Sequence, residues 1–113
     1  MTSRFARGRL SDPGSAPVTG ELVERVFGRD GVAIEHILSG ELEEPAAFCQ
    51  AEHEWVALLS GNARLRIAGE DLSLRAGEWL FLPAGLEHEL VETTSGARWL
   101  AVFFQPQRPT RPT

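Results

Sequence analysis

The side chains that could do chemistry in this 113-residue chain are few: three histidines, one cysteine and a set of carboxylates. An imidazole close to a carboxylate can transfer protons or hold a transition metal, so it matters which of them meet. The single cysteine, Cys49, cannot form an intramolecular disulfide, and no cation beside it in the sequence indicates a reactive thiol. We predict a small buried apolar role for it. The sequence has no P-loop, dinucleotide fingerprint, zinc ribbon or Gly-x-Ser-x-Gly motif, and no tyrosine.

Alternation along an extended segment predicts which side chains share a face. Successive residues of a strand point to opposite sides, so Phe48, Gln50 and Glu54 are expected on the same face as Val56 and Leu58. These five side chains would all point into a barrel if no bulge interrupts the strand.

Other chemically distinctive residues have the opposite parity or lie on other strands. His53 and Trp55 are expected to point away from Glu54, and Trp55 then packs against a second sheet or subunit. Trp79 and Trp99 are predicted as core or interface anchors. His36 lies on a separate strand and could face either way.

Short extended segments separated by turn residues fill the middle of the chain. Several of them alternate apolar and polar residues, which predicts sheets with one wet and one buried side. The predicted strands are 21–27, 32–38, 54–60, 63–68, 71–75, 79–82, 86–91 and 98–104. Gly61-Asn62 and Gly69-Glu70 each suit a tight hairpin turn. The pattern as a whole predicts an all-β sandwich or barrel.

The ends of the chain differ in composition from this strand-rich part. Residues 1–20 are rich in serine, glycine, proline and arginine and predict a flexible N-terminal arm, and the proline-rich residues 105–113 predict a C-terminal tail. A single domain is therefore expected over residues 21–104.

Charge and hydropathy exclude some classes of partner. The formal net charge of −5 argues against nucleic acid, whose backbone requires clustered cations on the protein. No apolar run approaches the ~20 residues of a membrane span, so no membrane partner is expected. With a single cysteine and no apolar stretch behind the N-terminal arginines, a cytoplasmic location is predicted.

Two segments resemble the two sequence motifs of the cupin family. Residues 77–88, GEWLFLPAGLEH, reproduce the second motif, G-x5-P-x-G-x2-H, in which Pro83 and Gly85 form a turn before His88. Residues 54–61, EWVALLSG, have the glutamate and glycine that end the first motif. A glutamine before the Glu-Trp pair and a closing Trp-Leu-Ala strand are similar to a subgroup of small single-domain bacterial cupins. The resemblance implies a double-stranded β-helix, or jelly-roll barrel.

The resemblance also implies where a metal would bind. A full cupin site uses two histidines of an H-x-H sequence, one glutamate and the histidine of the second motif. Glu54 and His88 match the last two positions, whereas Phe48 and Gln50 stand in place of the first two. Phenylalanine cannot ligate and glutamine offers only a neutral carbonyl oxygen. The implied reduced set is Gln50, Glu54 and His88, for one divalent ion of Zn, Fe, Mn or Ni.

Two alternatives to this ligand set stay open. A register shifted by one residue, which the family allows, would place Cys49 and Ala47 at the histidine positions. Alternatively no metal binds, and Glu54 and His88 form a buried ion pair or hydrogen bond that Gln50 completes. The sequence does not choose between these alternatives, because a buried carboxylate and imidazole need a partner in either case.

Three functions are compatible with the resemblance, which places a pocket inside the barrel. The predicted pocket residues are Phe48, Gln50, Glu54, Val56, Phe81 and His88. The first function is binding of a small molecule there, with or without the metal. The second is a metal-dependent isomerase, lyase or dioxygenase acting on a small acid or sugar-like substrate, in which Glu54 or His88 would move protons. The third is a structural or regulatory dimer.

The resemblance carries an expectation about assembly but none about catalysis. The resemblance to cupins of this length implies a homodimer. In it an N-terminal strand, here 21–27, would lie along the partner's sheet and cover an exposed edge. No catalytic residue is assigned, and whether the protein is an enzyme stays open.

Overall fold

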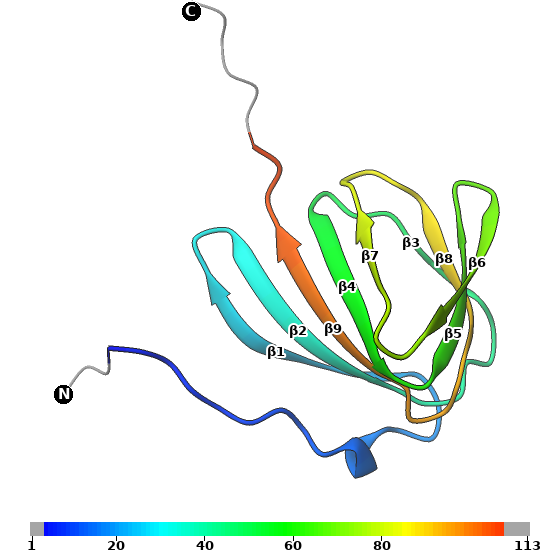
Figure 1. Cartoon of the computed structure of the whole chain (residues 1–113), viewed down its shortest axis with the longest axis horizontal. Coiled ribbons are helices and arrows are strands. Elements are labelled where there is room, and N and C mark those ends of the chain that lie inside the picture. The colour runs from blue at the N-terminus through cyan, green and yellow to red at the C-terminus, as the bar shows by residue number, and fades with distance from the viewer. Residues whose placement is uncertain (1–3, 108–113) are drawn as a thin grey trace, which may run out of the picture.

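The computed structural model describes residues 4–107, which form two antiparallel β-sheets (Figure 1). One sheet has the order β1-β2-β9-β4-β7 and the other the order β3-β8-β5-β6. The strands are β1 (Glu21–Arg29), β2 (Val32–Ser39), β3 (Ala46–Phe48), β4 (His53–Ser60), β5 (Asn62–Ile67), β6 (Glu70–Arg75), β7 (Trp79–Leu82), β8 (His88–Thr93) and β9 (Arg98–Phe104). The chain crosses between the sheets repeatedly, as in a jelly roll, so the predicted all-β barrel is confirmed. Within residues 4–107, no helix is long and apolar enough to cross a membrane.

The alternating pattern of β4 shows how the five-stranded sheet builds a core on one side. Its even-numbered residues Glu54, Val56 and Leu58 are buried, whereas His53 and Trp55 lie on the outer face. Leucines of the four-stranded sheet meet the buried residues from the opposite side, and burying each such side chain contributes about 1.5–3 kcal/mol. Members of the core come from both sheets: Val56, Leu58, Ala63, Leu65, Leu74, Leu82, Leu90, Ala97, Trp99 and Ala101.

The link between β4 and β5 differs from the hairpin predicted there. β4 pairs with β7 and β9, whereas β5 pairs with β6 and β8, so the chain passes from one sheet to the other at Gly61. Gly61 has φ of +87°, and a Cβ would lie 3.0 Å from the Cβ of Ala97. Glycine at this position is therefore required by a close crossing of the sheets.

Two smaller features of the four-stranded sheet also differ from the prediction. The short strand β3 was not predicted, because three residues are too few to show a period of two. The β5–β6 hairpin closes through Ala68-Gly69, one residue earlier than expected, and both residues have positive φ. This is the backbone that a two-residue type I′ turn requires.

The segment before β1 contacts the sheet at two places. Thr19 forms a β-bridge with Glu41. The preceding residue, Gly40, packs so closely against this segment that a Cβ there would lie 2.2 Å from the carbonyl oxygen of Pro17. Further towards the N-terminus, the backbone N–H and the hydroxyl of Ser11 donate to the carboxylate of Glu24 at 2.8 and 2.7 Å. The first three residues of the predicted arm and residues 108–113 of the predicted tail lie outside the described range.

Candidate functional site

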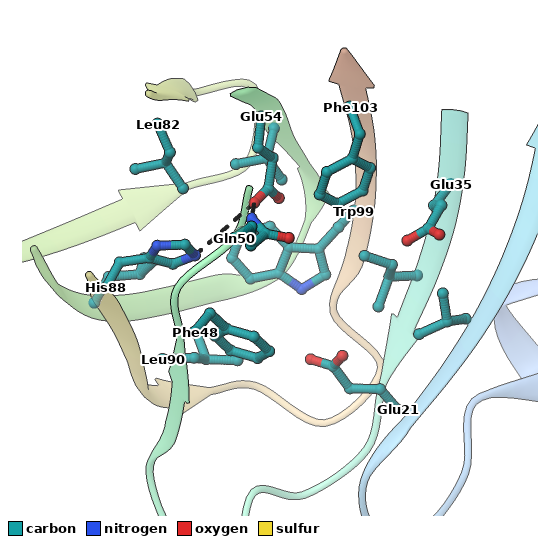
Figure 2. Close-up of a pocket in the computed structure, with 14 residues that line it drawn as sticks. Glu21, Glu35, Phe48, Gln50, Glu54, Leu82, His88, Leu90, Trp99 and Phe103 are labelled. Carbon is teal, nitrogen blue, oxygen red and sulfur yellow. Dashed lines mark hydrogen bonds and ion pairs between the residues drawn. The ribbon is translucent and has the colours of Figure 1, made fainter. Parts of the chain in front are cut away.

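A cavity of about 190 Å³ lies between the two sheets (Figure 2). Every strand except β6 contributes to its lining, and so does the loop that precedes β4. The walls are mainly apolar and include three aromatic rings, those of Phe48, Trp99 and Phe103. The lining also contains five residues with carboxyl, amide or imidazole groups: Glu21, Glu35, Gln50, Glu54 and His88. This combination of apolar walls and a few placed polar groups is typical of sites for small organic molecules.

Three of these polar side chains converge at one end of the cavity. The Nε2 atom of Gln50 donates to Oε1 of Glu54 at 2.5 Å, and Nε2 of His88 lies 3.8 Å from the same oxygen. The side chains of His88 and Glu54 are only 7% and 10% exposed. Figure 2 shows this cluster at the end formed by β4, β7 and β8. Both titratable groups are thus held where water is scarce and electrostatic interactions are strong.

Burial dominates the electrostatics of Glu54. Loss of solvent raises the pKa of its carboxyl group above the usual 4.5, and the nearby carboxylates of Glu35 and Glu52 raise it further. The hydrogen bond from Gln50 and the imidazole of His88 act in the opposite direction on the same pKa but do not cancel it. The carboxyl group therefore keeps its proton to a higher pH than an exposed glutamate does.

The orientation of His88 is fixed by its backbone surroundings. Its Nδ1 lies 3.1 Å from the carbonyl oxygen of Leu86, and because a carbonyl only accepts, Nδ1 carries a proton and donates. In the neutral ring Nε2 is then an unprotonated acceptor, and within the described residues no group donates to it. The ring of Phe48 stacks on the imidazole with centroids 5.6 Å apart. His88 thus presents one open acceptor nitrogen towards Glu54 and the cavity.

The turn before β8 brings Gln50 and His88 to the same end of the barrel. The N–H of Leu86 donates to the carbonyl oxygen of Pro83, and Gly85 has φ of +80°, which is the geometry of a type II turn. The N–H of Gly85 donates to the carbonyl oxygen of Gln50 at 2.8 Å, tying the turn to the loop before β4. The predicted role of Pro83 and Gly85 in presenting His88 therefore has a direct structural basis.

Two further carboxylates of the cavity come from β1 and β2 and were not predicted. Glu21 is exposed and Glu35 is half-buried, and the carboxyl groups of both point inwards (Figure 2). Burial, followed by the charge of Glu54, raises the pKa of Glu21. Glu35 shares its face of β2 with the cavity-lining Ile37, but the opposite face also mixes apolar residues with an ionisable one, His36. Parity alone therefore could not select Glu35.

The structure separates Phe81 from the other predicted pocket residues. Phe48, Gln50, Glu54, Val56 and His88 line the cavity, but Phe81 does not. It pairs in register with the outward-facing Trp55, so its side chain lies on the outer face and is 47% exposed. The prediction for Phe81 is therefore wrong, because the register between β4 and β7, which local sequence does not encode, places Leu82 inwards instead.

The structure also shows where the other predicted cysteine, histidine and tryptophan side chains point. Cys49 is exposed, so the buried apolar role predicted for it is wrong, since the residue follows the edge strand β3 in a surface loop. His53 points away from Glu54, as alternation predicted, and its Nδ1 accepts from the N–H of Ala84 at 2.9 Å. Trp99 is a core anchor whose indole N–H donates to the hydroxyl of Ser39. Trp55 and Trp79 contact each other on the outer face.

A second histidine–glutamate pair, His36 and Glu24, lies on the outer face of the five-stranded sheet. His36 is completely buried, its Nδ1 lies 2.8 Å from Oε1 of Glu24, and the Nε–H of Arg98 donates to its Nε2 at 2.7 Å. Since Nε2 accepts, Nδ1 is the donor to Glu24, which Ser11 also contacts. Both ring nitrogens of this histidine are therefore used inside the protein.

The donor set of the cavity does not reproduce a complete metal site. Gln50 directs its amide nitrogen, which is a donor and not a ligand, at the carboxylate of Glu54. Within residues 4–107, no three histidine, cysteine, aspartate or glutamate side chains are grouped to hold one ion. Glu54 and His88 remain as two strong ligands, fewer than the three or four protein ligands usual for a resident transition metal. The arrangement fits a hydrogen-bonded polar cluster more closely than a resident metal centre.

A jelly-roll barrel with a cavity between its sheets defines the structural class, and comparison with known proteins gives the family. The cupin domain profile matches residues 33–103, and the chain therefore belongs to the cupin family. No curated protein sequence matches the chain significantly.

Solved structures share this fold over most of their length. A Ralstonia eutropha protein proposed to be a mannose-6-phosphate isomerase superposes with a TM-score of 0.74 at 28% identity, covering 88% of this chain and 100% of that one. A Rhizobium leguminosarum protein of unknown function gives 0.73 at 16% identity, with 92% and 100% covered. The Clostridium difficile EutQ protein gives 0.65 at 18% identity, with 84% and 75% covered. The last two similarities are evidence of fold alone.

Proposed function

We propose that this protein is a small-molecule-binding cupin whose ligand occupies the cavity between the two sheets. The observation that carries the proposal is a cavity of about 190 Å³ with Gln50, Glu54 and His88 clustered at one end of otherwise apolar walls. An apolar cavity of ~150 Å³ accommodates benzene, so this one suits a ligand of about six to nine non-hydrogen atoms. An open acceptor on a buried histidine supplies a partner for a ligand that can donate a hydrogen bond.

Ligand-observed NMR with a fragment set of this size tests the proposal. Val23 lines the cavity and is 49% exposed, so Val23→Trp should block the mouth without disturbing the core. Val26 lies on the same strand, is 44% exposed and does not line the cavity, so Val26→Trp is the matched control. We expect fragments whose saturation-transfer signals persist in the control and disappear in Val23→Trp. Equal signals in both variants would place the fragments elsewhere and contradict the proposal.

A metal-dependent enzyme is the second candidate, and one observation favours it. The Nδ1–H of His88 donates to a backbone carbonyl, and its Nε2 lies near a carboxylate. Histidines that bind a metal or transfer a proton through Nε2 are commonly oriented by such a hydrogen bond at Nδ1. Elemental mass spectrometry of tag-free protein, beside His88→Ala, separates the candidates. About one Zn, Fe, Mn or Ni per chain, lost in the variant, would favour the enzyme. Negligible metal after incubation with these ions would leave the organic ligand.

We also propose that two copies associate through the outer face of the five-stranded sheet. Exposed apolar side chains gather there, with Trp79 59%, Phe81 47% and Leu59 40% exposed. A patch of this kind on a small protein is typical of an association surface. β1 pairs with β2 of its own chain and leaves its other edge open to a partner strand. Light scattering should give a dimer that Trp79→Ser combined with Phe81→Ser converts to a monomer; a monomeric wild-type protein at micromolar concentration would contradict this.

A further inference from the structure

We propose, on the basis of the binding function above, that the ligand of the cavity is a small organic amine, held through its ammonium group by the carboxylates of the cavity. The proposal follows from three features of the lining: its charge, the direction of its hydrogen-bonding groups, and the spacing of its carboxylates.

The charge of the lining is one-sided. Glu21, Glu35 and Glu54 contribute carboxylates, and no arginine lies among the lining residues. Arg25, whose Nη2 lies 3.8 Å from Oε2 of Glu35, is outside the cavity lining and its side chain is 66% exposed. In the part of the chain that the structure describes, the carboxylate of Glu21 makes no ion pair or hydrogen bond. A buried carboxylate is costly unless it is paired, and Glu54, whose side chain is 10% exposed, accepts its hydrogen bond from the neutral amide of Gln50, so an ammonium group would supply a full opposite charge.

The hydrogen-bonding groups of the lining are mostly acceptors. Ionised carboxylates only accept, and Nε2 of His88 is an open acceptor on a side chain that is 7% exposed. Gln50 carries the only amide among these groups, and its nitrogen already donates to Glu54. An ammonium group carries three donors and no acceptor, so it complements this set. The aromatic rings of Phe48 and Trp99 in the walls add favourable cation–π contacts.

The same charges disfavour an acidic ligand. A phosphate or carboxylate placed in the cavity would face Glu54 and Glu21, and burial followed by the charge of Glu54 already raises the pKa of Glu21. An inorganic cation is disfavoured for a different reason, since the carboxylates of the described residues are not grouped closely enough to ligate one ion. Carboxylates spread around an apolar cavity suit a cation that carries a hydrocarbon part.

Benzylamine, benzyl alcohol and benzoate form a matched set of probes, because they share a ring that fits the cavity and differ in the charge of the head group. Isothermal titration at pH 7 should show benzylamine binding at least about tenfold more tightly than benzyl alcohol, the effect of one charge-assisted hydrogen bond, and no binding of benzoate. Glu21→Gln and Glu54→Gln should each weaken benzylamine several-fold and leave benzyl alcohol unchanged. Glu70→Gln, at an exposed position at the start of β6 and outside the cavity lining, is the matched control and should change neither.

The outcomes distinguish failure of this inference from failure of the binding function. If benzyl alcohol or benzoate binds as tightly as benzylamine, and Val23→Trp abolishes that binding, the cavity binds ligands but the amine inference is overturned. If benzylamine binding is insensitive to both glutamate substitutions, the inference is overturned as well. If none of the three probes binds, and if no fragment loses its saturation-transfer signal in Val23→Trp, both the inference and the binding function are wrong. Glu21 is exposed, so Glu21→Gln tests the carboxylate contribution without altering the buried Gln50–Glu54–His88 cluster.

Discussion

Two histidine–glutamate pairs differ in how many partners the protein provides for them: one lies on the outer face of the five-stranded sheet, and the other lies between the sheets, with Glu54 on β4 and His88 on β8. On the outer face, His36 contacts Glu24 at 2.8 Å and accepts from Arg98. On the inner face, Nε2 of His88 lies 3.8 Å from Glu54 and no described group donates to it. Both histidines are buried, at 0% and 8% exposed. Residue type and burial are thus alike, and only the number of internal partners distinguishes them.

The difference separates a structural pair from a candidate binding pair. A buried polar group whose hydrogen-bonding sites are all used stabilises one arrangement of the chain. A buried group with an unused hydrogen-bonding site costs free energy unless a ligand supplies the missing partner. The outer pair also connects the segment around Ser11 to β1, β2 and β9. We therefore assign the outer pair to stability and the inner pair to the proposed function.

Mutation of the outer pair should reduce stability more than any other change considered. His36→Ala would leave Arg98 and Glu24 without their shared partner and open a cavity under the sheet. We expect a loss of about 3 kcal/mol in the free energy of unfolding, measured by urea denaturation. His88→Ala should lose less than half of that, because its ring has fewer partners. Equal losses in the two variants would remove the distinction between the pairs.

The acid limb of the stability curve should depend on Glu24. Hydrogen bonds from the hydroxyl and then the N–H of Ser11, followed by that from His36, lower the pKa of Glu24 to about 2. Because this pKa is depressed in the folded state, its contribution is complete above pH 4.5 and is lost as the pH falls towards 2. The melting temperature of Glu24→Gln should change less than that of the wild type over this range. Parallel curves for the two proteins would count against the network.

A smaller change of opposite sign is expected at the inner pair. The pKa of Glu54 is raised by burial, so ionising this group destabilises the folded state as the pH rises above 4.5. Glu54→Gln removes the ionisation and should raise the melting temperature at pH 7 by roughly 2–5 °C. The gain should vanish below pH 4.5, where the carboxyl is protonated in folded and unfolded states alike. A destabilised variant at pH 7 would show that Glu54 serves the fold.

The smallest effect concerns the N-terminal segment. Ser11→Ala removes the hydroxyl contact with Glu24 and should cost no more than about 1 kcal/mol of stability. Trypsin should then cleave after Arg7 or Arg9 a few times faster, because the segment opens more often. Ser15→Ala is the control, since the side chain of Ser15 is exposed and no hydrogen bond from it is observed. Equal cleavage rates in both variants would mean that Ser11 does not hold the segment.

Much of the fold and part of the cavity could be predicted from short patterns. Strand alternation and the spacing of the cupin motifs identified the jelly roll and brought Gln50, Glu54 and His88 together. Those predictions succeeded because a period of two and a turn are local properties of the chain. β3 was missed because three residues are too short to show a period.

The errors have a common physical origin. Phe81 was assigned to the cavity and the Gly61 link to a hairpin, and both assignments depend on which strands pair and in what register. Neither is encoded in a local pattern, since both faces of the five-stranded sheet are apolar and a shift of one residue exchanges them.

Local patterns were sufficient to predict that the chain forms strands, where most of them lie, and which residues match the cupin motifs, because alternation and motif spacing are properties of short segments. That Glu21 and Glu35 share the cavity with Glu54 required the assembled fold, as did the finding that both ring nitrogens of His36 have partners whereas no described group donates to Nε2 of His88. Each of these facts depends on distances between strands far apart in the chain, such as His36 and Arg98. Side-chain chemistry is local, but the number of partners a side chain finds is a property of the assembled sheets.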